Sequence, residues 1–125
     1  MKLYVMRHGP AEDDSPTGRD ADRALTGPGR ERVRDVAKAL VDADEAPLAI
    51  VSSPLVRALQ TAEIVAAVAK VEAPVEVRRE MEPGAQALGL VEELFAAKRK
   101  RVMVVGHEPD VSDLVARLVG EAPAA

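Results

Sequence analysis

The sequence predicts an α/β fold: a single-domain, three-layer α/β/α sandwich around a mainly parallel sheet. Four short apolar runs suited to buried strands alternate along the chain with four segments of helical period. Strands that alternate with helices pair in parallel, because each helix returns the chain to the same end of the sheet. The predicted domain spans residues 1–125, with residues 121–125 as a frayed tail.

The predicted strands are short runs dominated by Val, Ile, Leu and Met. Runs of this length and composition are typical of strands buried inside an α/β domain. The third run is the exception, because it is short and charged. In chain order the predicted strands are Lys2–Met6, Leu48–Ser52, Val75–Arg78 and Arg101–Val105.

Apolar residues spaced three and four positions apart predict the first and last helices. This spacing places them on one helix face, which is the face expected to meet the sheet. In the first helix the face comprises Val33, Val36, Ala37, Leu40 and Val41. In the last helix it comprises Val111, Leu114, Val115, Leu118 and Val119.

The third helix is predicted over residues 85–98. The basic residues 98–100 suit the negative end of its dipole. Its inward side chains are predicted to be Leu88, Val91 and Phe95.

Start signals mark the other three helices. Ser53 is placed to cap the free amides of the second helix, and Pro54 in its first turn loses no hydrogen bond. The other two signals are Thr26 with Pro28 and Glu108 with Pro109. Residues 10–22 are polar, acidic and contain Gly and Pro, so they predict a surface loop over the exit of the first strand.

The composition excludes several classes of protein. The chain has no cysteine, which excludes disulfides, thiolate metal sites and a cysteine nucleophile. With one Tyr, one Phe, no Trp and a net charge of −4, it offers nucleic acid neither stacking platforms nor general attraction. No stretch approaches the about 20 apolar residues of a membrane span, and no secretory signal precedes Arg7, so a cytoplasmic location is expected.

Residues suited to phosphate chemistry come at the carboxyl end of each predicted strand. In chain order they are Arg7 and His8, then Ser52, Ser53 and Arg57, then Glu80, and finally His107. In an open parallel sheet these ends share one edge, where ligands bind and helix amino termini direct their amides at anions. We therefore expect these side chains to meet in one site.

The two histidines and two of the arginines suggest distinct roles in that site. A neutral imidazole can attack phosphorus and form a covalent phosphohistidine, so His8 is the candidate nucleophile. Arg7 and Arg57 are candidates for holding phosphate, because the guanidinium group matches its geometry. His107 is the candidate donor to a phosphoryl oxygen. The alternative is that these are ordinary strand-end and surface residues.

Four stretches carry a resemblance to a known family. They are Arg7-His8-Gly9 with Ala11, Leu25-Thr26 with Gly29, Ser52 to Ala62, and Gly106-His107-Glu108-Pro109. In this order they resemble the histidine phosphatase superfamily, which has the phosphoglycerate-mutase-like fold, and within it the SixA-type phosphohistidine phosphatases. The resemblance implies that His8 is phosphorylated, that Arg7, Arg57 and His107 complete the phosphate pocket, and that no metal or cofactor takes part.

Glu80 is the candidate proton donor. Glu80 to Gly84 looks like the Glu-x-x-x-Gly stretch that supplies this group in larger relatives, although Glu80 as a surface charge and Glu82 as the acid are alternatives. An alcohol leaving group needs a proton strongly, whereas a phosphohistidine can be protonated on its other ring nitrogen. A weak internal acid would therefore suit phosphohistidine better than phosphoesters.

The spacing of the motifs bears on the substrate. Between Arg57, Glu80 and His107 there is room for only one helix and one strand each, where larger relatives insert capping segments. A pocket without a lid should be open enough for a phosphorylated protein side chain, such as that of a phosphorelay histidine domain. A phosphatase of small phosphomonoesters and a non-catalytic phosphate-binding module are the alternatives, and the oligomeric state is open. Because the family usually adds a strand after the last helix, the sheet edge is expected to be trimmed or closed by a partner.

Overall fold

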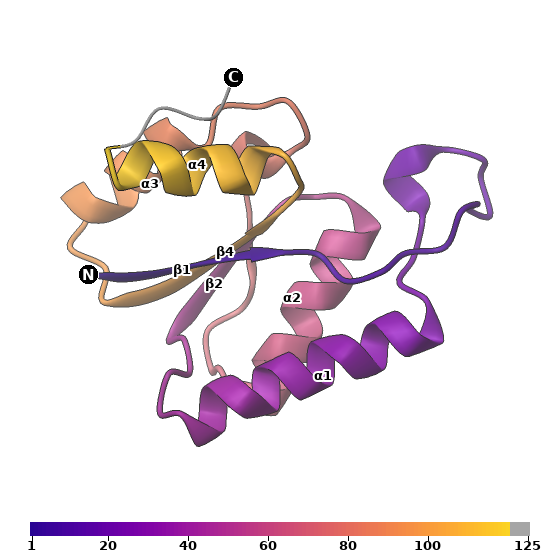
Figure 1. Cartoon of the computed structure of the whole chain (residues 1–125), viewed down its shortest axis with the longest axis horizontal. Coiled ribbons are helices and arrows are strands. Elements are labelled where there is room, and N and C mark those ends of the chain that lie inside the picture. Colours follow the sequence, from indigo (N-terminus) through magenta and orange to yellow (C-terminus); the bar gives the residue numbers. More distant parts are fainter. Residues whose placement is uncertain (121–125) are drawn as a thin grey trace.

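The computed structural model of the chain describes residues 1–120 and shows three layers (Figure 1). The central layer is a four-stranded sheet in the order β1-β4-β2-β3, and all its strand pairs are parallel. The strands are β1 (Lys2–Arg7), β2 (Ala49–Ser52), β3 (Glu76–Val77) and β4 (Arg101–Gly106). The predicted α/β/α sandwich is confirmed, while the predicted tail at 121–125 lies outside the described residues.

Helices cover both faces of the sheet. Helices α1 and α2 lie on one face, and α3 and α4 lie on the other (Figure 1). Two short 3-10 turns, η1 (Asp20–Asp22) and η2 (Arg79–Met81), lie in the connections. The helices are α1 (Gly27–Asp42), α2 (Val56–Ala69), α3 (Leu88–Ala96) and α4 (Asp110–Leu118).

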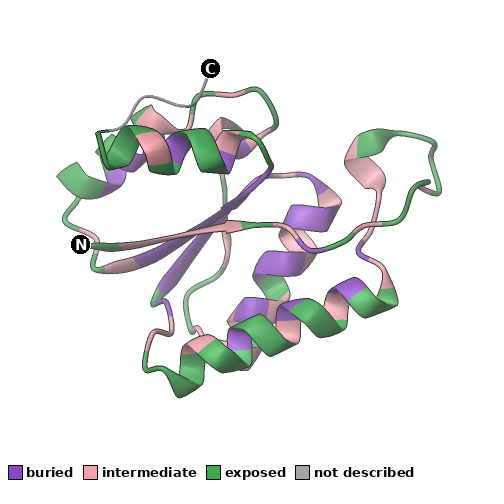
Figure 2. Cartoon of the chain, in the orientation of Figure 1, coloured by how far each residue is buried: buried purple, intermediate pink, exposed green. Residues whose placement is uncertain are grey.

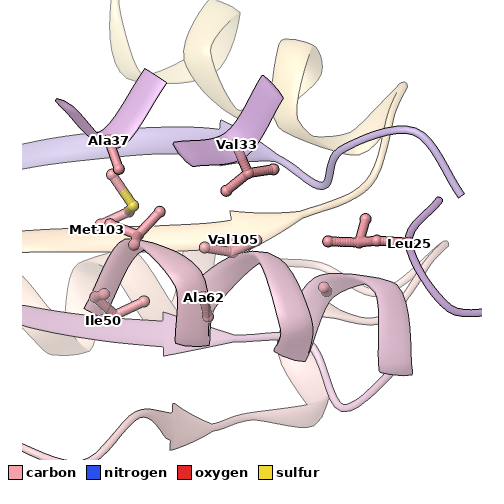
Figure 3. Close-up of a cluster of buried hydrophobic side chains, with 9 residues drawn as sticks. Leu25, Val33, Ala37, Ile50, Ala62, Met103 and Val105 are labelled. Atoms are coloured by element: carbon pink, nitrogen blue, oxygen red, sulfur yellow. The ribbon is translucent and has the colours of Figure 1, made fainter. Parts of the chain in front are cut away.

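The core is aliphatic and divides into one cluster on each face of the sheet. Along β4, Met103 and Val105 pack toward α1 and α2, whereas Val102 and Val104 pack toward α3 and α4. Figure 3 shows the first cluster, in which Val33 and Ala37 of α1 face Met103 and Val105. Because both faces are covered, the inner strands are apolar at consecutive positions and are buried except at Arg101, the first residue of β4 (Figure 2).

The predicted strand boundaries agree with the structure to within one residue at every end. The start signal at Thr26 is also confirmed, because its hydroxyl accepts the Gly29 amide at 2.8 Å. Glu108 stands one residue before Pro109, the N-cap of α4, and its carboxylate accepts the Ser112 amide in the first turn at 3.0 Å. The predicted cap of α2 is wrong: α2 begins at Val56, and the Ser53 hydroxyl accepts the amide of Leu55 instead.

Two predictions about buried faces need correction. Phe95 is 48% exposed, because α3 turns Leu90, Val91 and Leu94 toward the sheet. The apolar faces of α1 and α4 are only partly buried. The exposed members are Val36, Val41, Val115, Leu118 and Val119.

The position of β1 accounts for part of this exposure. Within residues 1–120, β1 pairs with β4 alone, so its other side is the edge of the sheet. Val36 of α1 and Val115 of α4 each line a groove beside Val5 of β1. No strand among the described residues covers them there.

The loop that follows β1 returns to the body of the protein. An isolated bridge joins Ala11 to Leu25, and the Thr26 amide donates to the Pro10 carbonyl at 3.0 Å. Gly29 permits this approach, since a Cβ there would lie 2.2 Å from the Pro10 carbonyl oxygen. Across residues 1–120, none of the helices combines the length and apolar character that a membrane crossing requires.

Candidate active site

The structure brings His8, Arg57 and His107 together at the carboxyl edge of the sheet. The parallel register pairs Arg7 with Gly106, so the residues that follow, His8 and His107, emerge side by side. Their ring centroids are 5.1 Å apart. Arg57, in the first turn of α2, donates from Nε to Nε2 of His8 at 3.3 Å.

The hydrogen bonds of His8 fix its tautomer. Nδ1 lies 2.7 Å from the carbonyl oxygen of Gly9. A carbonyl only accepts, so Nδ1 carries the proton and Nε2 is left with a lone pair facing Arg57. Burial, followed by the positive charges of Arg57, Arg23 and Arg7, lowers the pKa of His8, against an opposing effect from the Gly9 carbonyl. The ring is therefore held neutral in the form that attacks phosphorus.

Gly9 fixes the backbone that carries this contact. Its amide donates to the Thr61 hydroxyl at 3.1 Å, and that hydroxyl donates to the Arg57 carbonyl at 2.8 Å. A Cβ on Gly9 would lie 2.7 Å from Cγ2 of Val33. Glycine is needed here because the turn after β1 packs directly against α1.

His107 is more deeply buried than His8 and is held by a side chain. It is 3% exposed, and its Nε2 lies 2.8 Å from the hydroxyl of Ser53. That hydroxyl accepts the Leu55 amide and keeps both its proton and a second lone pair for Nε2, so the contact fits either tautomer of His107. The other ring nitrogen, Nδ1, has no hydrogen-bond partner within residues 1–120. Burial, with smaller contributions from His8 and Arg57, lowers the pKa of His107 to about 4.

Arg57 is only 5% exposed, and Asp20 holds its outer end. Its Nη1 donates to the backbone carbonyl of Asp20 at 2.9 Å, and its Nη2 donates to Oδ2 of the same residue at 3.2 Å. Sequence reasoning missed Asp20 because residues 10–22 predicted only a surface loop. It also assigned Ser53 to helix capping rather than to His107. No local pattern indicates either contact, since each joins segments far apart in the chain.

The Arg7 side chain forms no hydrogen bond or ion pair in the part of the chain that the structure describes. Arg7 ends β1 and is exposed, and its backbone pairs with Gly106 of β4. With His8 and Glu108 it lines an open groove of about 610 Å³ beside β1. Its charge is nevertheless near enough to contribute to the lowered pKa of His8.

Glu80 lies in η2 and is engaged by a neighbouring arginine. Arg78 pairs with Glu80 and also donates to Glu93 at 2.7 Å. The hydrogen bonds from Arg78 lower the pKa of Glu80, so the carboxylate is ionised at neutral pH. Glu80, Glu82 and His107 all line one small cavity, but no hydrogen bond joins either carboxylate to His107 among the described residues. In residues 1–120, no group of three His, Cys, Asp or Glu side chains is arranged to hold a metal ion.

A parallel α/β/α sandwich that presents two neutral imidazoles and a buried arginine at one sheet edge has the histidine phosphatase fold. The family model of the histidine phosphatase superfamily (branch 1) matches residues 3–83. The chain belongs to this family, as the resemblance in its motifs predicted.

Individual relatives place the chain near the SixA proteins. A solved structure of the protein histidine phosphatase SixA complexed with tungstate is 33% identical, with a TM-score of 0.88, covering 100% of this chain and 81% of that one. A protein from Agrobacterium tumefaciens, described as a candidate phosphohistidine phosphatase SixA, is 28% identical with a TM-score of 0.81, covering 95% of this chain and 77% of that one. An uncharacterized protein of Picosynechococcus sp. (strain ATCC 27264 / PCC 7002 / PR-6) is 37% identical over 90% of this chain and 70% of its own length.

Proposed function

We propose that the chain is a metal-independent phosphatase that forms a phosphohistidine on His8 and removes phosphate from phosphohistidine in a protein. The observation that carries the proposal is the Nε2 lone pair of His8, which is fixed by the Gly9 carbonyl and faces Arg57. The similar SixA structure supports it, because that protein is a protein histidine phosphatase and its structure contains tungstate. Tungstate is a tetrahedral oxyanion of the same general shape as phosphate.

The reaction then has two displacement steps. In the first, the Nε2 lone pair of His8 forms a bond to phosphorus, the bond to the substrate nitrogen breaks, and its electron pair stays on the substrate imidazole. In the second, water attacks phosphorus, His8 recovers its lone pair, and inorganic phosphate leaves. The proton of His8 stays on Nδ1 throughout, hydrogen-bonded to the Gly9 carbonyl.

Three other residues stabilise the charge that develops on the phosphoryl oxygens. We assign Arg57 and Arg7 to hold these oxygens, and His107 to donate a hydrogen bond as negative charge grows. Arg7 is exposed and lines the same groove as His8. Glu80 is assigned as the proton donor for leaving groups that need one, which requires the carboxylate to take up a proton against its pairing with Arg78.

The open groove favours a protein substrate. His8 and Arg7 line it together with apolar side chains of β1 and α1, whereas Arg57 and His107 do not, so the groove offers a phosphorylated side chain a route from solvent to His8. A histidine domain of a phosphorelay has the required chemistry, and the proposal places the enzyme in cytoplasmic signalling.

Turnover measurements test the proposal. Purified protein is given a phosphohistidine-containing phosphorelay domain and, separately, a panel of nucleotide and sugar phosphates. We expect much faster turnover of phosphohistidine, and a loss of at least about 1000-fold in His8→Ala. Arg34→Ala, which changes an arginine of α1 that pairs with Glu31 and does not line the groove, is the matched control. Full turnover by His8→Ala refutes the mechanism, preference for phosphomonoesters refutes the substrate, and tight phosphate binding without turnover indicates a binding module.

A further inference from the structure

The guanidinium group of Arg57 has two distinct edges, and they face different partners. Nε and Nη2 form the side edge, whereas Nη1 and Nη2 form the outer edge. Nε donates to His8, while one proton each from Nη1 and Nη2 goes to Asp20. The outer edge is thus occupied, and the side edge presents Nε–H, which donates to His8, with the second Nη2 proton on the same side of the guanidinium group.

Asp20 is itself held in place by the loop that carries it. Its second carboxylate oxygen, Oδ1, accepts from Nε of Arg23 at 2.9 Å. Arg23 also donates from Nη1 to the carbonyl of Glu12 at 2.9 Å, and Glu12 lies on the opposite side of the loop. The bridge between Ala11 and Leu25 closes the base of this loop. The contacts form a continuous chain from the loop backbone through Arg23, Asp20 and Arg57 to His8.

Because Arg57 is buried, it depends on these hydrogen bonds to stay in place. A guanidinium group that is 5% exposed loses most of its hydration, and it stays in place only if its donors are satisfied. Among residues 1–120, Asp20 is the one carboxylate that pairs with Arg57. Because it approaches the outer edge, it does not occupy the position beside Nε2 of His8.

We propose that Asp20, braced by Arg23, is the positioning residue that orients the side edge of Arg57 toward a phosphoryl group on His8. This assignment rests on the proposed function for its catalytic consequence. The orientation of Arg57 itself can be measured without any substrate.

Titration of His8 by NMR tests the orientation. Four groups bear on the His8 ring: the cationic Arg57, Arg23 and Arg7, and the imidazole of His107. The loss of the negative charge of Asp20 would by itself lower the pKa of His8 further, because a nearby anion favours the protonated ring. Releasing Arg57 would raise that pKa instead, because Nε2 loses both a donor and an adjacent cation. The two effects therefore have opposite signs.

We expect Asp20→Ala to raise the pKa of His8 and Arg23→Gln to raise it by less. Asp22→Ala, which removes an equal charge from the same turn, is the control and should leave it unchanged. The Asp20 side chain is 65% exposed, so its removal leaves no buried cavity, and amide spectra verify the fold of each variant. An unchanged or lower pKa of His8 in Asp20→Ala overturns the proposal.

Binding and turnover measurements separate this proposal from the proposed function. With orthovanadate as the probe, Asp20→Ala should bind about 10-fold more weakly, and its kcat on phosphohistidine should fall on the order of 10- to 100-fold. Asp20→Glu should recover part of both losses. If the pKa of His8 rises but wild-type protein turns over no phosphorylated compound, the positioning role stands and the function fails. If wild-type turnover is present but the pKa does not rise, only the positioning role fails.

Discussion

The two imidazoles of the site lie 5.1 Å apart, but different groups hold them. His8 is oriented by a backbone carbonyl, that of Gly9, which no side-chain substitution can delete. His107 is oriented by one hydroxyl, that of Ser53, and is more deeply buried. The orientation of the nucleophile therefore depends on the backbone, whereas the orientation of the second histidine depends on a single side chain.

Loss of the second imidazole is expected to have the largest effect. His107→Asn should lower kcat on phosphohistidine by about 100- to 1000-fold, which is the usual cost of removing one donor to a developing oxyanion. Rapid-quench kinetics provide the measurement, and the phosphorylated enzyme should still form, slowly, on His8. Normal kcat in this variant would show that His107 does not contact the phosphoryl group.

Loss of the hydroxyl that holds His107 should have a smaller effect. Ser53→Ala leaves Nε2 of His107 without its hydrogen-bond partner, so the ring can exchange tautomers, and kcat should fall by about 10-fold. The ¹⁵N shifts of His107 report the tautomer directly and should indicate a single tautomer in the wild type and a mixture in Ser53→Ala. Ser52→Ala is the control, because Ser52 is equally buried but donates to the Ser53 carbonyl rather than to a histidine. Identical ¹⁵N shifts in Ser53→Ala and wild type would contradict the assignment.

The buried imidazoles also predict how stability depends on pH. Because the pKa of His107 is about 4 in the folded chain and about 6.5 when unfolded, only the unfolded chain gains this proton between those values. His8 contributes in the same direction. The free energy of unfolding should therefore fall as the pH drops from 6.5 toward 4, and it should be restored above pH 6.5.

Urea unfolding at several pH values in this window provides the measurement. His107→Asn should fall less steeply than wild type, since it has one fewer group that gains a proton on unfolding. Equal slopes for the two proteins would mean that the pKa of His107 is not lowered by folding.

Substitution of Glu80 should have the smallest effect on the proposed substrate. Arg78 holds the Glu80 carboxylate ionised, and a phosphohistidine leaving group can take its proton on the other ring nitrogen. We expect Glu80→Gln to change phosphohistidine turnover by less than about 3-fold and phosphomonoester turnover by more. Glu82→Gln is the control for a neighbouring charge. A large loss on phosphohistidine would show that Glu80 donates the proton to this substrate as well.

The sequence predicts the site residues that follow a strand, but not the side-chain contacts that hold them. His8, Arg57 and His107 were found because each follows an apolar run, and parallel strands bring such positions to one edge. The ends of the strands are predicted to within one residue, because the apolar runs mark the buried strands. The roles of Asp20 and Ser53 were missed, because they depend on contacts between side chains 37 and 54 residues apart.

The errors in burial have a related cause. The sequence predicts a buried Phe95, because its spacing from Leu88 and Val91 places it on an apolar helix face. The structure shows that α3 instead packs on the sheet through Leu90, Val91 and Leu94. Helical spacing identifies an apolar stripe, whereas the neighbouring elements decide which part of it is covered. Val36 and Val115 show the same effect beside β1, the edge strand of the sheet.

The position of the phosphoryl group on the enzyme tests the central claim most directly. Protein mixed with a phosphohistidine substrate is quenched in base, and the labelled peptide is located by mass spectrometry and ³¹P NMR. We expect one phosphoryl group, on Nε2 of His8, because the Gly9 carbonyl keeps the proton on Nδ1. A phosphoryl group on Nδ1 of His8 or on His107, or turnover with no phosphorylated enzyme at all, would contradict the account.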